Sequence, residues 1–358
     1  MPNTPHEAAA AALAANVMSR AEKGGFALTS EIHREALGLV RRLAKSGRTP
    51  QALLSEFMIG FRAILQKYEP ILARTISDAQ LAAFLQGGRG ITQSIPGLGP
   101  PMSLYERLQH GGPPEPPDWA RQMSMPWEPK PVVRFKIIEE AAADLAGREL
   151  MTSQGFHEAA AMGRVNGFMV SRIASLDALE KVRDSLVDAV VEGHSLRTWG
   201  EKVAEAIEGS GLSPGRQAML FRDTIMTSYS RGQKAVAEHP QVQSVATFVI
   251  RSEIDDSRLT ALCRVLSHSG LDGTAIYCTA DPTWRRVSPP SHHNCRCNSV
   301  FIDLERAATR YGIKIAQQWL ESGQRPSPEE LFVPMPDLSG VPESERRQFE
   351  SWQSAWAA

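Results

Sequence analysis

The sequence predicts an α+β protein that is mostly α-helical. Apolar residues recur at three- and four-residue spacing through most of the chain, which is the period of one helix face. Only two short segments, residues 244–252 and 298–302, are rich in the β-branched and aromatic residues typical of strands. Ten of the 24 prolines fall in residues 87–131, so neither a helix nor a central strand is expected there.

These patterns divide the 358 residues into four predicted units. Residues 1–86 form a helical N-terminal domain, and residues 87–131 form a Pro-rich linker or arm. Residues 132–303 form a helical module that ends in a small strand and loop region with a Cys/His cluster. Residues 304–358 form a C-terminal helix and a Pro- and charge-rich tail. The length agrees with two or three domains of about 100 to 200 residues each.

Helix starts are visible in the N-terminal domain. Thr49 followed by Pro50 predicts one, because threonine caps a helix and proline is tolerated at the first helical position. Ser77 and Asp78 predict another by the same capping chemistry. We therefore expect several separate helices before residue 86.

The composition excludes several classes of protein. With 42% apolar and 22% charged residues, the chain has the make-up of a folded globular protein. Lys and Arg total 39 against 40 Asp and Glu, so there is no strong nucleic-acid signal. No apolar run approaches the roughly 18 residues of a membrane-spanning helix, and the start of the chain does not resemble a signal peptide. We expect a soluble, unexported protein with no membrane partner.

Both Pro-rich regions carry large apolar side chains that need a surface to cover them. Trp119 and Trp127 favour an arm that lies on a neighbour over a solvated linker. In the tail, Phe349, Trp352 and Trp356 fall on one face of a short helix. We expect this tail helix to dock on another subunit or on the body of the protein.

All four cysteines lie in residues 263–297, together with three histidines. Cys-x4-His at the start of this region and Cys-x-Cys at its end make two close pairs of donors. Four such nitrogen and sulfur donors suit the tetrahedral coordination of zinc. The predicted ligands of one structural zinc ion are Cys263, His268, Cys295 and Cys297.

Other interpretations of the same residues stay open. Cys278, and His292 or His293, are reserve ligands. Cys295-x-Cys297 equally fits two small core residues on one face of a strand, because free cysteine is often buried.

Catalytic interpretations fit less well. A thiol nucleophile usually lies at a helix N-terminus, whereas Cys295 and Cys297 precede a predicted strand. An HNH-type nuclease needs its Asn on a following helix, whereas Asn294 directly follows His293. The sequence has no glycine-rich phosphate loop and no evident acid/base pair. We expect that the protein is not an enzyme.

Three further patterns follow one another in the chain. The first is the helical run FRDTIMTSYSRGQ at residues 221–233. The second is the predicted strand around residues 248–252, followed by Asp256 and by HSGLDG at residues 268–273. The third is DPTW at residues 281–284 with PPSHHNCRC at residues 289–297.

In this order the patterns resemble the phage Mu F-like minor head protein family, also called phage head morphogenesis proteins. The resemblance covers residues 135–303. It departs from the family pattern at Asp223, where the family has Thr, and at Ser228-Tyr229-Ser230, where the family has Ala-Tyr-Asn. The family's CxxC before the LDG element has no counterpart, since Cys263 lies elsewhere and His268 takes its second position.

The resemblance implies a minor capsid protein that acts in phage procapsid assembly and associates with the portal. The implied partners are portal protein, scaffold or major capsid protein, and the implied locations are the phage head of the virion and the host cytoplasm during assembly. The alternative is a phage-delivered enzyme, a nuclease or toxin, that uses a Mu F-like module for packaging. Only about 55 residues follow residue 303, too few for most catalytic domains. A third interpretation is a zinc-stabilised interaction module unrelated to phages.

Overall fold

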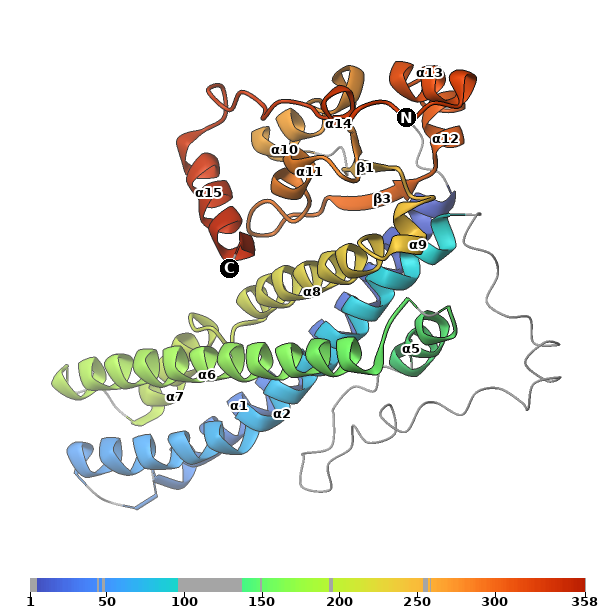
Figure 1. The fold of residues 1–358 in the computed structure, drawn as a ribbon. Helices are drawn as coiled ribbons and strands as arrows, with labels where there is room; N and C mark the ends of the chain where they lie inside the picture. Colours follow the sequence, from blue (N-terminus) through green and yellow to red (C-terminus); the bar gives the residue numbers. More distant parts are fainter. Residues whose placement is uncertain are drawn as a thin grey trace, which may run out of the picture.

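The computed structural model describes residues 5–43, 45–46, 49–95, 137–148, 150–192, 196–253, 257 and 259–357. Long helices form one part of the molecule, and a small sheet with short helices lies across them (Figure 1). The fold is mostly helical with one small sheet, so the predicted class is confirmed. The long helices are α1 (Pro5–Leu43), α2 (Pro50–Ser94), α5 (Ile137–Gly147), α6 (Ser153–Val191), α7 (Leu196–Glu208) and α8 (Pro214–Ala237).

Two helices start at capping residues. Thr49 caps α2 by accepting a hydrogen bond from the backbone N–H of Ala52, as predicted, and Pro50 is the first helical residue. Ser213 caps α8 in the same way, again with proline in the first turn. The start predicted at Ser77 and Asp78 is wrong, because α2 continues through these residues to Ser94.

Helix α2 also continues past residue 86, where the sequence predicted the end of the helical domain and the start of a Pro-rich segment. At this place α2 crosses α8 with almost no space between the backbones. A Cβ on Gly87 would lie 1.9 Å from the carbonyl oxygen of Tyr229, and a Cβ on Gly232 would lie 1.8 Å from that of Phe84. These glycines therefore allow the crossing, and its packing outweighs their low helix propensity.

One buried apolar cluster draws on α1 and α2 as well as on α6, α7 and α8. It contains Phe57 and Phe61 of α2, Val182 of α6 and Tyr229 of α8. A second cluster contains the far end of α2, α5, the start of α6 and one side of the sheet. Helices α2 and α8 contribute to both clusters, so the helices of residues 1–86 share their core with the module of residues 132–303.

The sheet has three antiparallel strands in the order β2-β1-β3. The predicted strand at residues 298–302 is confirmed as β3 (Asn298–Ile302), with Phe248 opposite Ile302 in the register. The predicted strand at 244–252 is shorter, because residues 244–247 form a turn and an irregular segment between α9 (Pro240–Gln243) and β1 (Phe248–Ser252). Strand β2 (Ile276–Cys278) has only three residues and was not predicted.

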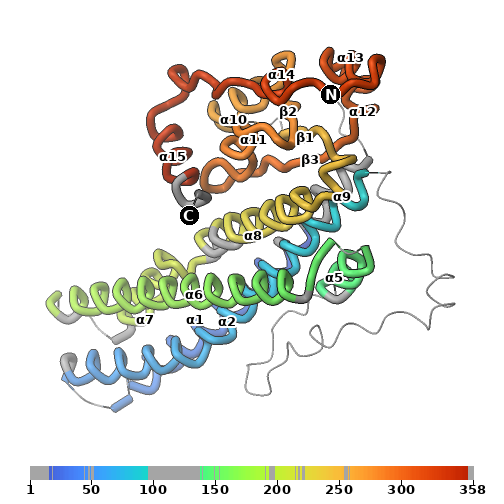
Figure 2. Tube along the Cα trace, in the orientation of Figure 1, coloured from blue at the N-terminus to red at the C-terminus, as the bar shows by residue number. Residues whose placement is uncertain are grey.

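Short elements surround the sheet and carry the chain to its end (Figure 2). They are α10 (Ala261–Leu266), the 3-10 turn η2 (Leu271–Gly273), α11 (Pro282–Val287), α12 (Leu304–Thr309), α13 (Lys314–Ser322), α14 (Pro328–Leu331) and α15 (Glu343–Ala357). None of the helices in the described part of the chain is both long and apolar enough to cross a membrane.

The C-terminal helix α15 docks on the body of the protein. Phe349 is buried in the second cluster, and Glu345 accepts a hydrogen bond of 2.8 Å from the backbone N–H of Leu262 at the start of α10. The ring of Trp352 meets the ring of His293 edge-on. The side chain of Trp356 and the predicted arm with Trp119 and Trp127 lie outside the described residues.

Candidate metal centre

Three of the four cysteines meet beside the sheet. Cys263 lies in the first turn of α10, where Thr260 caps the helix by accepting a hydrogen bond of 3.1 Å from the Cys263 N–H. Cys295 and Cys297 lie on the segment that leads into β3. All three side chains are buried, and they form a small cluster of their own.

His292 completes the group. Its Nε2 lies 3.0 Å from Cys263 Sγ, and Cys297 Sγ lies 3.4 Å from the same sulfur. The ligand atoms of Cys263, His292 and Cys295 all lie within 4.8 Å of one another. Donors on a tetrahedral zinc ion are separated by about 3.5 to 3.8 Å, given typical Zn–N and Zn–S bond lengths. Cys263, His292 and Cys295 could therefore hold a metal ion after small shifts of their side chains.

The loop before β3 is shaped to bring these donors together. Asn294 has a positive φ of 60°, which reverses the chain, and the N–H of Cys295 donates to the carbonyl of His292. The Nδ1 of His292 lies 2.7 Å from the carbonyl oxygen of His293. Because a carbonyl only accepts, Nδ1 carries a proton, and Nε2 is the nitrogen available to a metal.

The surroundings favour thiolate, the metal-binding form of cysteine, at Cys263, whereas contacts with Cys263 and Cys295 and burial raise the pKa of Cys297. Hydrogen bonds from Cys295 and Cys297 lower the pKa of Cys263 well below its ordinary value, against the effect of burial, and His292 and Arg251 act in the same direction. Burial acts to lower the pKa of His292, but its contacts with Cys263 and Cys295 outweigh burial and raise that pKa to about 10.

Arg251 of β1 is a buried cation beside these sulfurs. Only 1% of the residue is exposed, and its Nη2 lies 3.5 Å from Cys263 Sγ. Its Nη1 donates to the carbonyl of Val287 and, at 3.1 Å, to Ser291 Oγ. Burial acts to lower the pKa of Arg251, but the three thiols outweigh it and raise that pKa. A divalent ion with three thiolates and one neutral histidine carries a charge of −1, which Arg251 would balance.

The structure brings two of the predicted ligands, Cys263 and Cys295, together with His292; Cys297 lies beside Cys263 but outside this group, and His268 lies apart. His268 lies beyond the end of α10, is exposed, and places its Nδ1 2.8 Å from the carbonyl oxygen of Arg264. His292, which the sequence offered only as a reserve, lies in the cluster instead. The other reserves lie elsewhere: Cys278 packs into a different apolar cluster, and His293 is exposed with its Nδ1 3.0 Å from Asp223 Oδ2.

Sequence reasoning missed Arg251, although a signal was present. Arg251 is the one charged residue in the predicted strand SVATFVIRS. A charge in such a segment is rarely buried without a partner of opposite charge. Its pairing with cysteines in a distant segment could not be inferred, because the order of strands in the sheet was unknown.

The fold and this cluster define a mostly helical α+β protein with a buried Cys/His group that could hold a metal ion. Comparisons with family models, with curated proteins and with solved structures find no match to this chain.

Proposed function

We propose that the protein is a minor capsid protein that acts in phage procapsid assembly and associates with the portal. The observation that carries the proposal is that segments of the Mu F-like resemblance contact one another. The helical pattern at residues 221–233 lies on α8, and the PPSHHNCRC pattern lies beside it. Sequence order alone does not require these patterns to meet.

The contacts involve the positions at which this chain departs from the family pattern. Asp223 accepts a hydrogen bond of 2.5 Å from the Asn294 N–H and also contacts His293. Ser230 donates a hydrogen bond of 2.5 Å to the carbonyl of Pro289. The altered residues therefore connect the two patterns in this chain, which supports one shared module.

Within this module we propose that the metal is zinc and that its role is structural. Three cysteines and one histidine are a common donor set of structural zinc, and four protein donors leave no open position for a substrate. The ion would link α10, through Cys263, to the start of β3, through Cys295 and Cys297. The segment between them contains short elements and turns, so a metal clip offsets part of the entropy cost of ordering it.

An exposed apolar face on α6 supports a role in binding another protein. Its residues recur at three- and four-residue spacing and are 47–62% exposed: Met162, Val165, Met169, Ile173 and Leu176. A contiguous apolar face of this kind is typical of a protein-binding surface. We propose that the α6 face binds the portal; scaffold and major capsid protein are the other candidate partners.

Replacing Met169 and Ile173 together with glutamine is expected to reduce incorporation into procapsids by about tenfold or more, since apolar anchors at an interface each contribute about 1 to 2 kcal/mol. The measurement is the amount of protein in purified particles after co-expression with portal, scaffold and major capsid proteins. Stability is expected to change by less than about 0.5 kcal/mol, because both side chains are exposed.

The matched control is Arg164→Gln, an exposed position on another side of the same helix. Normal incorporation of the double variant would contradict binding through the α6 face. Normal particle assembly without the protein, together with DNA cleavage by the purified protein that His293→Ala abolishes, would favour the delivered enzyme instead.

A further inference from the structure

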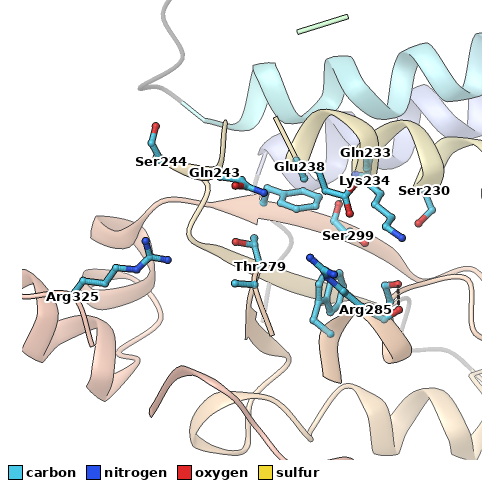
Figure 3. A pocket seen from close by; sticks show the side chains of 15 residues that line it. Ser230, Gln233, Lys234, Glu238, Gln243, Ser244, Thr279, Arg285, Ser299 and Arg325 are labelled. Atoms are coloured by element: carbon cyan, nitrogen blue, oxygen red, sulfur yellow. Dashed lines mark hydrogen bonds between the residues drawn. The ribbon is translucent and has the colours of Figure 1, made fainter. Parts of the chain in front are cut away.

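A cavity of about 250 Å³ lies between α8, α11 and the sheet, outside the Cys/His cluster (Figure 3). Gln233 and Lys234 of α8 lie on one side of it, and Arg285 of α11 lies opposite. Arg325, from the segment between α13 and α14, lies toward the end near Ser244. Segments far apart in the sequence thus contribute to one cavity.

The cavity carries an excess of positive charge. Lys234, Arg285 and Arg325 line it with a single carboxylate, that of Glu238, which gives a formal charge of +2. Among the described residues, none forms an ion pair with any of these three cations, although Arg325 lies over the ring of Trp319. Three cations around one cavity with a single carboxylate favour an anionic ligand.

One wall of the cavity also presents a buried acceptor that lacks a donor. Gln233 is only 3% exposed, and its Nε2 donates a hydrogen bond of 2.7 Å to the carbonyl of Ser299. Its Oε1 accepts no hydrogen bond from the described part of the chain. A buried acceptor without a partner costs about 1 to 3 kcal/mol. Because Oε1 is covered here, a ligand that supplies an N–H or O–H would gain affinity from it once a small shift of the Gln233 side chain opens it to the cavity.

The remaining lining is partly apolar. Trp284 and Phe301 are almost fully buried and line the cavity with Ala237 and Ala280. A ligand that fits should therefore combine an anionic group, a hydrogen-bond donor and a short apolar stem. Inorganic phosphate has the charge and an O–H donor, but it has no such stem.

We propose that this cavity binds an acidic peptide segment. The carboxylates of such a segment would face Lys234, Arg285 and Arg325, and a backbone N–H would donate to Gln233 Oε1. The methylene groups of an Asp or Glu side chain would lie against Trp284 and Phe301. The inference concerns a surface other than the α6 face, and its failure leaves the proposed role in procapsid assembly untouched.

Isothermal titration calorimetry with the full-length protein tests the proposal. The probes are acetyl-Glu-Gly-Glu-amide, its counterpart with lysine in place of glutamate, and inorganic phosphate at the same ionic strength. We expect only the glutamate peptide to bind measurably, and its affinity to fall as salt is added. A glutamate peptide with methylated backbone nitrogens should bind more weakly than the unmethylated one. Methylation removes the N–H donors for Gln233 and leaves the protein unchanged.

The double variant Lys234→Gln/Arg285→Gln is expected to raise the Kd of the glutamate peptide by about tenfold, a typical sum for two partly exposed charge contacts. Both residues are exposed, so the variant is expected to fold normally. Arg286→Gln is the matched control: it removes the same charge from the next residue of α11, which does not line the cavity. Equal binding of phosphate, equal binding of the lysine peptide, or an unchanged Kd in the double variant would each overturn the proposal.

Discussion

Replacing Cys263 with serine is expected to abolish binding of one zinc ion and to lower the free energy of unfolding by about 4 kcal/mol. This is the stabilisation that a ligand contributes when its free concentration is about a thousand times its Kd, and structural zinc sites reach that regime readily. Cys263 contacts both His292 and Cys297, so its loss removes a donor at the centre of the cluster. Elemental analysis gives the zinc content, and urea denaturation with and without a chelator gives the stability.

Two pairs of variants distinguish loss of metal binding from loss of core packing: Cys263→Ser with Cys278→Ser, and His292→Ala with His268→Ala. Cys278→Ser changes a buried cysteine outside the cluster and should retain a full equivalent of zinc, whatever its cost in packing. His292→Ala should lose the metal, whereas His268→Ala should retain it. If Cys295→Ser and Cys297→Ser melt like the native protein, and zinc stays below about a tenth of an equivalent against one full ion, the cysteines are core residues.

Replacing Gly232 with alanine is expected to cost more than about 3 kcal/mol, at the upper end of overpacking effects. The new Cβ would lie 1.8 Å from the carbonyl oxygen of Phe84, and the next nearest atoms also belong to the backbone of Phe84. No side chain can move aside, so α2 and α8 must separate. Urea denaturation followed by far-UV circular dichroism measures the loss.

Gly215→Ala is the matched control, because Gly215 lies on the same helix and nothing lies within 4 Å of its added Cβ. It should leave stability unchanged or raise it by up to about 1 kcal/mol through helix propensity. A Gly232→Ala protein as stable as the native one would mean that the two helices do not approach this closely.

The helical period and the capping residues made much of the fold predictable from the sequence. The capped start of α2 at Thr49 and the strand β3 depend on local signals, and both were predicted correctly. The length of α2 was not predictable, because Gly87 lowers helix propensity locally and gains its value only against α8. Strand β2 gave too short a signal, and it is a strand only because β1 lies beside it.

The sequence predicted that cysteines and a histidine form the candidate metal centre, but it did not predict which histidine. Clustering along the chain identified Cys263, Cys295 and Cys297, since donors for one ion often come in close pairs. The choice between His268 and His292 depended on where α10 ends and on the turn at Asn294, which only the folded chain defines. The positive charge of the cavity could not be predicted from the sequence either, because its cations come from separate elements.

Helix α2 is synthesised well before the helices α6 and α8 that pack against it. After Ser94 the ribosome must add about 140 more residues before α8 is complete at Ala237. At typical elongation rates this takes roughly 7 to 30 s. Among the described residues, the face of α2 that meets α8 has no partner until then, and the face that meets α6 has none until α6 ends at Val191. The nascent protein therefore exposes apolar helix surface early, and its yield should depend on chaperones that hold such surface during translation.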